Sequence, residues 1–326
     1  MTYWSDKRVL VTGATGMVGS WAVRRLVDEG AHVVCLVRDA DPQSELLRSG
    51  TINRTTVVNG RLEDYDAVER SVNEHDVDTI LHLGAQTIVG TAYRSPMQTL
   101  QANVAGTWNV LETARVHPGL VRRVVVASSD KAYGSVPDLP YREDMPLRGT
   151  APYEVSKSCT DLVSTSYAVT YGTPVAIARC GNIYGGGDLN WSRIVPGTIR
   201  ALLRGEQPVL RSDGTFLRDY LYVEDVVDAY LVTAQALDGT VAPGEAFNFS
   251  DEKPLSVMDI YAAVCHATVG EAVAPLVLGQ AKDEIKDQYL DAAKARSALG
   301  WSVAWGLERG LTETVSWYRQ LLQSRT

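Results

Sequence analysis

The chain has 326 residues, of which 45% are hydrophobic and 21% charged, so it is long enough to bury a large core in about two domains. The 39 acidic side chains outnumber the 31 basic ones, and a net charge of −8 without a basic run excludes nucleic acid as the main partner. No apolar run reaches the roughly 18 residues of a membrane span or resembles a signal peptide, and the four cysteines lie far apart, so we expect a cytoplasmic protein with no membrane partner and no metal site.

The first half of the chain alternates apolar runs with helical patterns. Strands are predicted at 8–12, 32–37, 55–58, 79–83, 123–127 and 174–179, and helices at 21–29, 66–73, 99–116 and 156–171. Each strand is a continuous apolar run, which is typical of a parallel sheet covered by helices on both faces. We therefore predict an α/β fold with a doubly wound parallel sheet of the Rossmann type, whose ligand lies at the carboxyl ends of the strands.

The regular alternation of strands and helices ends after residue 184. A loop is predicted at 185–191, a helix at 194–204, a strand and turn at 209–216, a helix at 223–237 and a last amphipathic helix at 307–322. We predict a large domain of residues 1–183, to which 218–240 return. Residues 184–217 and 241–326 are expected to form a smaller mixed α/β cap that closes over a cleft.

A glycine-rich turn, TGATGMVG at 12–19, joins the first strand to the first helix. Gly13, Gly16 and Gly19 let the backbone approach a pyrophosphate, which the amino end of the helix then faces, so the turn predicts a dinucleotide. The alternative is a tight turn without a ligand. After the second strand, Asp39 would bind the 2′-hydroxyl of NAD and Arg38 the 2′-phosphate of NADP, which leaves the choice between NAD and NADP open.

Tyr153 and Lys157 begin the helix that follows Pro152. Their i, i+4 spacing places a phenol and an ammonium on one helical face, where the positive charge is expected to lower the tyrosine pKa toward that of a general base. The spacing is common by chance, and it gains meaning only after a glycine turn and five strand–helix units.

These motifs, with HLGAQ at 82–86 and Ser129, resemble the extended short-chain dehydrogenase/reductases. GNIYGGG at 181–187, RDYLYVEDVVDAY at 218–230 and KARSALGW at 294–301 are similar to the nucleotide-sugar epimerases and dehydratases of that family, so the resemblance covers nearly the whole chain. It implies a tightly bound NAD or NADP, a nucleoside-diphosphate sugar as substrate, a Ser–Tyr–Lys catalytic set, a sugar-binding cap and a homodimer joined through a helix bundle.

An acid and a base, Asp130 and Lys131, follow the fifth predicted strand. Epimerases of the family carry small or neutral residues there, 4,6-dehydratases an acid and then a base, and CDP-glucose 4,6-dehydratases Asp-Lys. The resemblance implies that Tyr153 takes the O4 proton, Lys131 the C5 proton, and Asp130 protonates the departing C6 hydroxyl. Ser129 would bind O4 and Lys157 the cofactor ribose.

We therefore predict an NDP-hexose 4,6-dehydratase, with CDP-glucose favoured, that forms a 4-keto-6-deoxy sugar. An NDP-sugar 4-epimerase acting through a 4-keto intermediate is the alternative, and a cofactor-binding regulatory protein without turnover is a third.

The resemblance also implies the residues that contact each ligand. For the cofactor they are Gly13, Thr15, Gly16, Met17, Val18, Gly19, Arg38, Asp39, Leu62, Leu83, Ala85, Gln86, Asn103, Tyr153 and Lys157. For the substrate they are Gln86, Ser129, Asn182, Arg193, Arg211 and Arg218, whose arginines suit a diphosphate.

Overall fold

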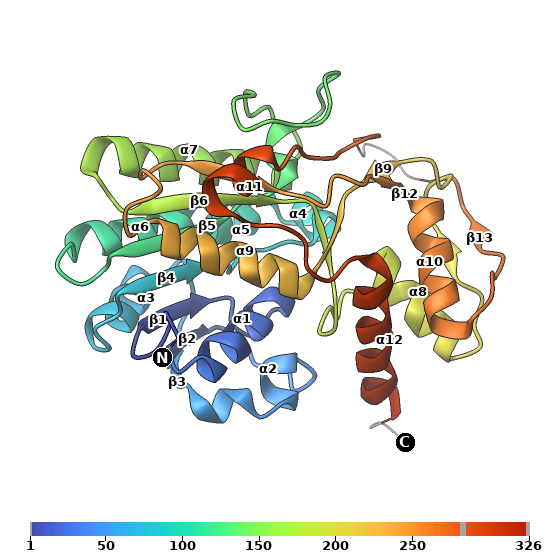
Figure 1. Cartoon of the computed structure of the whole chain (residues 1–326), viewed down its shortest axis with the longest axis horizontal. Helices are drawn as coiled ribbons and strands as arrows, with labels where there is room; N and C mark the ends of the chain where they lie inside the picture. The colour runs from blue at the N-terminus through green and yellow to red at the C-terminus, as the bar shows by residue number, and fades with distance from the viewer. Residues whose placement is uncertain (1, 281–284, 324–326) are drawn as a thin grey trace.

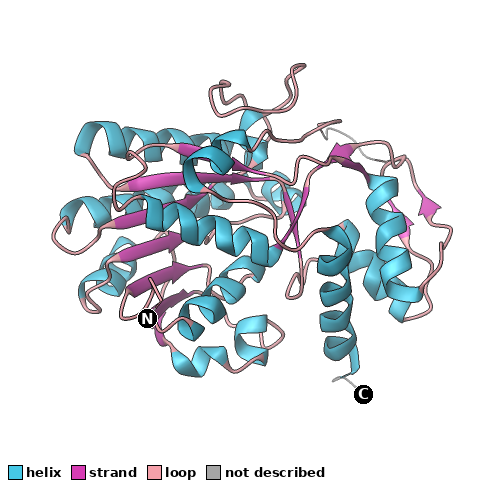
Figure 2. Cartoon of the chain, in the orientation of Figure 1, coloured by secondary structure: helices cyan, strands magenta, loops and turns pink. Residues whose placement is uncertain are grey.

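The structure is a computed structural model that describes residues 2–280 and 285–323. Its central feature is a seven-stranded parallel sheet, in the order β11-β6-β5-β4-β1-β2-β3 (Figures 1 and 2). The strands are β1 (Arg8–Thr12), β2 (His32–Val37), β3 (Thr56–Asn59), β4 (Thr79–His82), β5 (Arg123–Ala127), β6 (Val175–Cys180) and β11 (Ala246–Phe249). The predicted doubly wound α/β fold is confirmed.

Helices cover both faces of this sheet. One face carries α1 (Met17–Asp28), α9 (Val223–Ala236) and α11 (Ala293–Leu299), and the other carries α3 (Tyr65–Asn73), α6 (Gly106–Val116) and α7 (Pro152–Tyr171). Successive strand residues enter opposite cores: Val9 and Val11 pack with the first group and Leu10 with the second. Both faces are therefore apolar, which explains the continuous apolar runs.

Strand β11 lies in the large sheet, whereas the sequence analysis placed residues 246–249 in the cap. It pairs with β6, and its Phe247 and Phe249 are fully buried in the core of the large sheet. α11 packs on β11, so this segment also lies with the sheet. The run AFNF has only four residues, and its pairing with a strand about seventy residues earlier is not visible in local pattern.

The second lobe lies beyond the carboxyl ends of the strands (Figure 1). It contains α8 (Ile194–Leu203) and α10 (Val257–Val269), which pack on each other, and the terminal helix α12 (Leu307–Gln323), which contacts both. Its short strands are β8 (Val209–Leu210) with β13 (Leu276–Val277) and β9 (Leu217–Arg218) with β12 (Leu255–Ser256), while β7 (Asn182–Tyr184) pairs with β10 (Tyr220–Tyr222) between the lobes.

The helix predicted at 99–116 is interrupted in the structure. It consists of α5 (Pro96–Leu100), a wide π-helical turn η2 (Gln101–Ala105) and then α6. Within the turn, the Asn103 side chain accepts from Gln86 N at 2.7 Å and donates to Gln86 O at 3.0 Å. Such turns often mark functional sites, and here the turn holds the segment after β4.

The remaining elements are short connections on the large domain. They are α2 (Glu45–Arg48), η1 (Thr51–Arg54), α4 (Val89–Arg94) and η3 (Asp130–Tyr133). Across 2–280 and 285–323, every helix falls short of the length or the apolar character that crossing a membrane requires.

Candidate active site

A cavity of about 900 Å³ lies at the carboxyl ends of the parallel strands. The segments after β1, β2, β4, β5 and β6 form its floor, and α8, β9 and the residues around 285–288 close it from the second lobe. The sheet order reverses between β1 and β4, and such a switch point is where open α/β sheets bind their ligands. Its volume lies in the upper part of the range found for ligand pockets.

Every predicted site residue except Asn103 lines this cavity. Asn103 is 1% exposed and lies behind Gln86, with its amide also donating to Ser156 Oγ at 2.9 Å. The structure therefore places Asn103 as a support for the wall rather than as part of it.

The glycine turn fits a pyrophosphate by its close packing. A Cβ on Gly19 would lie 2.1 Å from the Gly13 carbonyl oxygen, and Gly13 itself has a φ of +68°. Gly16 is the N-cap of α1 and has no side-chain acceptor for the first N–H groups of that helix. These N–H groups and the helix dipole suit an anion, so the residues present fit a dinucleotide cofactor.

Arg38 and Asp39, at the end of β2, bind each other. Arg38 Nε donates to Asp39 Oδ2 at 2.6 Å, and both side chains are exposed at the rim of the cavity. Thr15 Oγ1, in the glycine turn, donates to the Asp39 carbonyl at 3.3 Å. The pair is thus held beside the glycine turn.

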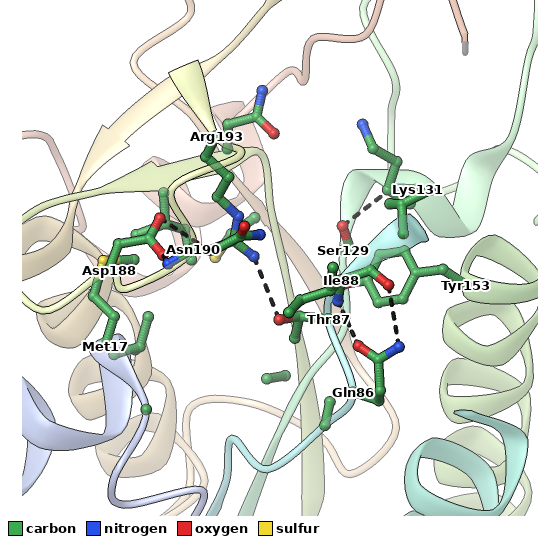
Figure 3. A pocket seen from close by; sticks show the side chains of 18 of the residues that line it. Met17, Gln86, Thr87, Ile88, Ser129, Lys131, Tyr153, Asp188, Asn190 and Arg193 are labelled. Carbon is green, nitrogen blue, oxygen red and sulfur yellow. Dashed lines mark hydrogen bonds and ion pairs between the residues drawn. The ribbon is translucent and has the colours of Figure 1, made fainter. Parts of the chain in front are cut away.

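The acid and base after β5 lie on η3 and line the cavity instead of facing bulk water. Asp130 is 2% exposed and its Oδ1 accepts from Ser129 Oγ at 2.8 Å. Lys131 Nζ lies 3.6 Å from Asp130 Oδ2 and donates to Gln288 Oε1. The Lys131 side chain extends away from Ser129 and Tyr153 (Figure 3).

Tyr153 and Lys157 occupy successive turns of α7, as predicted, but the expected lowering of the tyrosine pKa is not found. Burial raises the pKa of Tyr153 to about 12, against smaller lowering effects of Arg193 and the Ser129 hydroxyl. Lys157 Nζ instead donates to the Ala127 carbonyl at 2.6 Å, and burial lowers its own pKa to about 8. Desolvation of both side chains is the reason.

Arg193 spans the cavity between the two lobes (Figure 3). Its guanidinium lies 3.1 Å from Asp188 Oδ2, in the loop before α8, and donates to Thr87 Oγ1 at 3.3 Å, in the loop after β4. The predicted substrate residue Arg193 therefore meets two side chains that the sequence analysis did not select.

Arg218 also binds other parts of the chain. It is 8% exposed, and its guanidinium donates to the carbonyls of Leu217, at 2.7 Å, and Lys286, at 2.6 Å, and also to that of Ile285. It thereby fixes residues 285–291, which we call the strap. Among the described residues, three of its five N–H groups have an acceptor, which leaves two that can face a ligand.

The strap also supplies Gln288, which the sequence analysis did not select. The residue sits in no motif, and only pairing across the fold brings it to the cavity. Within the described ranges, no group of three His, Cys, Asp or Glu side chains is placed to hold a metal ion.

Residues 9–249 match the description "NAD dependent epimerase/dehydratase family". The chain belongs to this family.

Members of the family with different reactions resemble the chain to similar degrees. The CDP-glucose 4,6-dehydratase of Salmonella typhimurium is 31% identical over 97% of this chain and 92% of its own length. The crystal structure of the UDP-glucose 4-epimerase of Thermotoga maritima with UDP-glucose has a TM-score of 0.88, 28% identity, and coverage of 97% of this chain and 99% of that one. The dTDP-glucose 4,6-dehydratase of Streptomyces venezuelae, with NAD bound, has a TM-score of 0.84, 28% identity, and coverage of 96% and 97%. The reaction of this family member must therefore be argued from its own site.

Proposed function

We propose that the protein is an NDP-hexose 4,6-dehydratase whose favoured substrate is CDP-glucose. The observation that carries this proposal is the pair Asp130 and Lys131, which lie 3.6 Å apart and line the same cavity as Ser129 and Tyr153. Elimination of water across C5 and C6 needs a base and an acid on neighbouring atoms. An epimerase needs neither, because it only moves a hydride between the faces of C4.

Each side chain has one task in this reaction. Bound NAD would supply a hydride acceptor and a positive charge. Tyr153 takes the O4 proton as the C4–H bond breaks, with Ser129 donating to O4. Lys131 then takes the C5 proton, the C5=C6 double bond forms, and the C6–O bond breaks as Asp130 gives that oxygen its proton. Water leaves, and a 4-keto-6-deoxy sugar results once Lys131 returns a proton to C5 and C6 receives the hydride removed from C4, which the reduced cofactor would hold in the meantime.

We propose NAD as the cofactor because Arg38 is engaged by Asp39. An arginine that recognises a 2′-phosphate needs its fork of N–H groups, whereas here its Nε lies 2.6 Å from a carboxylate. A carboxylate in this position suits the 2′-hydroxyl of NAD and repels a phosphate. Lys157, at 4% exposure, would hold the cofactor ribose.

The substrate diphosphate would bind between the lobes. Arg193 and Arg218 line the cavity from the second lobe, together with Asn182. Arg211 and Phe216 lie in the same wall, and we propose that they contact the nucleotide base. In this proposal residues 1–183 with 218–240 bind the cofactor, and the cap, without β11 and α11, binds the sugar nucleotide.

The proposal is tested with a panel of NDP-hexoses labelled with deuterium at C4. A 4,6-dehydratase gives a product lighter by one water with the label moved to C6, and we expect this most rapidly with CDP-glucose. Lys131→Met should still oxidise C4, seen as reduced-cofactor absorbance, but fail to eliminate water. An isomer of unchanged mass would instead establish the 4-epimerase, and no product from any sugar would indicate a protein without turnover.

We also propose that two copies of the chain associate through α5, α6 and α7. These helices expose large apolar side chains: Met97, Trp108, Leu162, Val169 and Tyr171 are between 46% and 77% exposed. Large apolar side chains that are exposed on three neighbouring helices mark a candidate interface, and a twofold pairing would remove them from water. Light scattering should show a dimer that Leu162→Lys with Val169→Lys dissociates, whereas Val209→Lys, in the cap, leaves it intact.

We place the working protein in the cytoplasm. All four cysteines are free thiols, and Cys35, Cys180 and Cys265 are buried, which fits a reducing compartment. Fractionation of the native cell would test this assignment.

A further inference from the structure

The strap, residues 285–291, is fixed on two sides by backbone hydrogen bonds. Gln288 N donates to Leu217 O at 3.0 Å, and Asp291 N donates to Tyr141 O at 2.9 Å. Isolated bridges join Gln288 to Arg218 and Leu290 to Tyr141. The register of the strap is therefore determined, and with it the direction in which each of its side chains points.

This register places Gln288 against Lys131. The Gln288 side chain is 1% exposed and lines the cavity, and its Oε1 accepts from Lys131 Nζ. An ammonium only donates hydrogen bonds, so the amide must turn its oxygen toward the lysine. Its Nε2 then has no well-formed hydrogen bond among the described residues. The Gln288 amide also lies near the Tyr141 hydroxyl and acts to lower the pKa of Tyr141, but burial has the larger effect and raises it. The amide orientation therefore follows from the lysine.

Gln288 carries no charge, and this affects how easily Lys131 can act as a base. An amide oxygen accepts a hydrogen bond from both the ammonium and the neutral amine, so it holds Lys131 before and after the proton moves. A carboxylate in the same place would favour the charged ammonium and oppose release of its proton. Among the described residues, the charged or titratable groups around this contact include Asp130, at 3.6 Å from Lys131, the buried Tyr141, and Arg218, which bridges Gln288.

We propose that Gln288 is a positioning residue of this enzyme, which fixes the Lys131 amine in the cavity wall while leaving it free to exchange a proton. The inference rests on the proposed dehydratase function, because it assigns Gln288 to the residue that takes the C5 proton. It extends the working site from η3 to the strap, so that a segment about 150 residues away in sequence controls the base.

Two variants test separately the lack of charge on Gln288 and its ability to accept a hydrogen bond from Lys131. Gln288→Glu keeps the shape and the acceptor but adds a negative charge, and Gln288→Met keeps the length but removes the acceptor. Gln288→Met should fold, because it removes a buried donor that has no partner among the described residues, and Gln288→Glu should fold because its new charge lies against the Lys131 amine. Lys286→Ala is the matched control, since that side chain is on the same strap but exposed.

The first measurement is acetylation of Lys131 as a function of pH, followed by peptide mass spectrometry. It does not depend on turnover. The midpoint should rise by about 1–3 pH units in Gln288→Glu, because an opposite charge within a few ångströms favours the ammonium. A midpoint that coincides in Gln288→Glu, Lys286→Ala and the unsubstituted protein would overturn the proposal.

The second measurement is steady-state kinetics on the best NDP-hexose. Gln288→Met should lower kcat about tenfold or more with KM changed less than about threefold, because positioning of the base acts on the chemical step. Reduced cofactor should accumulate during turnover, because C4 oxidation precedes the affected step. A kcat equal to that of Lys286→Ala would refute the role. Failure of the unsubstituted protein to dehydrate any sugar would refute the proposed function instead, and the acetylation titration would still decide whether Gln288 controls Lys131.

Discussion

Asp219, whose carboxyl binds the backbone of the strap, allows a sharp test of how a buried acid affects the stability of the protein. Its carboxyl is 1% exposed, and Oδ2 accepts from Leu290 N at 2.7 Å. Burial raises the pKa of Asp219 from 3.8 to about 7, an effect that the hydrogen bond from the Leu290 N–H opposes. We expect that Asp219→Asn, which keeps an oxygen for Leu290 N but cannot ionise, stabilises the protein at high pH.

The sign and the size follow from proton linkage. Between pH 3.8 and about 7 the folded protein holds a proton on Asp219 that the unfolded chain has released. The contribution of this group to stability is therefore greatest below pH 3.8 and falls as the pH rises to about 7. The interval is about three pH units at 1.36 kcal/mol each, so Asp219→Asn should raise the free energy of unfolding by up to about 4 kcal/mol at about pH 8 and by less than about 1 kcal/mol at about pH 4.

Urea denaturation followed by the fluorescence of the seven tryptophans measures both values. Asp213→Asn is the control of opposite sign, because hydrogen bonds from Thr215 lower the pKa of the exposed Asp213 and its neutralisation should weaken the protein at high pH. An Asp219→Asn effect that is equal at the two pH values, or larger at low pH, would refute the reasoning.

Three further predictions concern one buried histidine and two groups that line the cavity. His82 is buried between Thr12, at 2.9 Å, and Thr107, at 3.1 Å, and burial lowers its pKa from 6.5 to about 3. Stability from this group is full above pH 6.5 and lost as the pH falls toward 3, so about 2 kcal/mol should disappear by about pH 5; urea titrations in which His82→Gln shows the same pH slope would contradict this. Tyr153→Phe should lower kcat at least about a hundredfold while calorimetry finds sugar-nucleotide affinity within a few-fold of normal, and a parallel loss of affinity would mean a structural role. Asp39→Ala should release Arg38 and shift the ratio of NADP to NAD affinity toward NADP in fluorescence titrations, and an unchanged ratio would place the pair outside the cofactor site.

Much of the candidate site could be predicted because its residues follow strand ends. Gly13, Asp39, Ser129 and Lys131 each lie within four residues of the end of a strand, and the carboxyl ends of parallel strands meet at one edge. Tyr153 and Lys157 could be predicted from a different local pattern, namely their i, i+4 spacing in the helix that follows Pro152. These inferences need only local pattern and the parallel direction of the strands.

Other parts of the site depend on contacts between distant segments. Gln288 reaches Lys131 because the strap is fixed between Tyr141 and Leu217, and β11 joins the sheet by pairing with β6. The wide turn η2 replaces a regular helix because Asn103 binds the backbone after β4. None of these pairings leaves a signal in the residues on either side.

The amino-acid sequence by itself determined the layout of this protein: a doubly wound sheet, a dinucleotide turn and an acid–base pair at the end of the fifth strand. The alternation of strands and helices and the spacing of motif residues are local properties of the sequence, so they can be read without knowing which segments pack together. The protonation behaviour of Tyr153 and Lys157, the pairing of Arg38 with Asp39, and the partner of Lys131 were decided only in the tertiary structure. Desolvation and charge interactions depend on which groups are removed from water together, and folding alone brings those groups into contact.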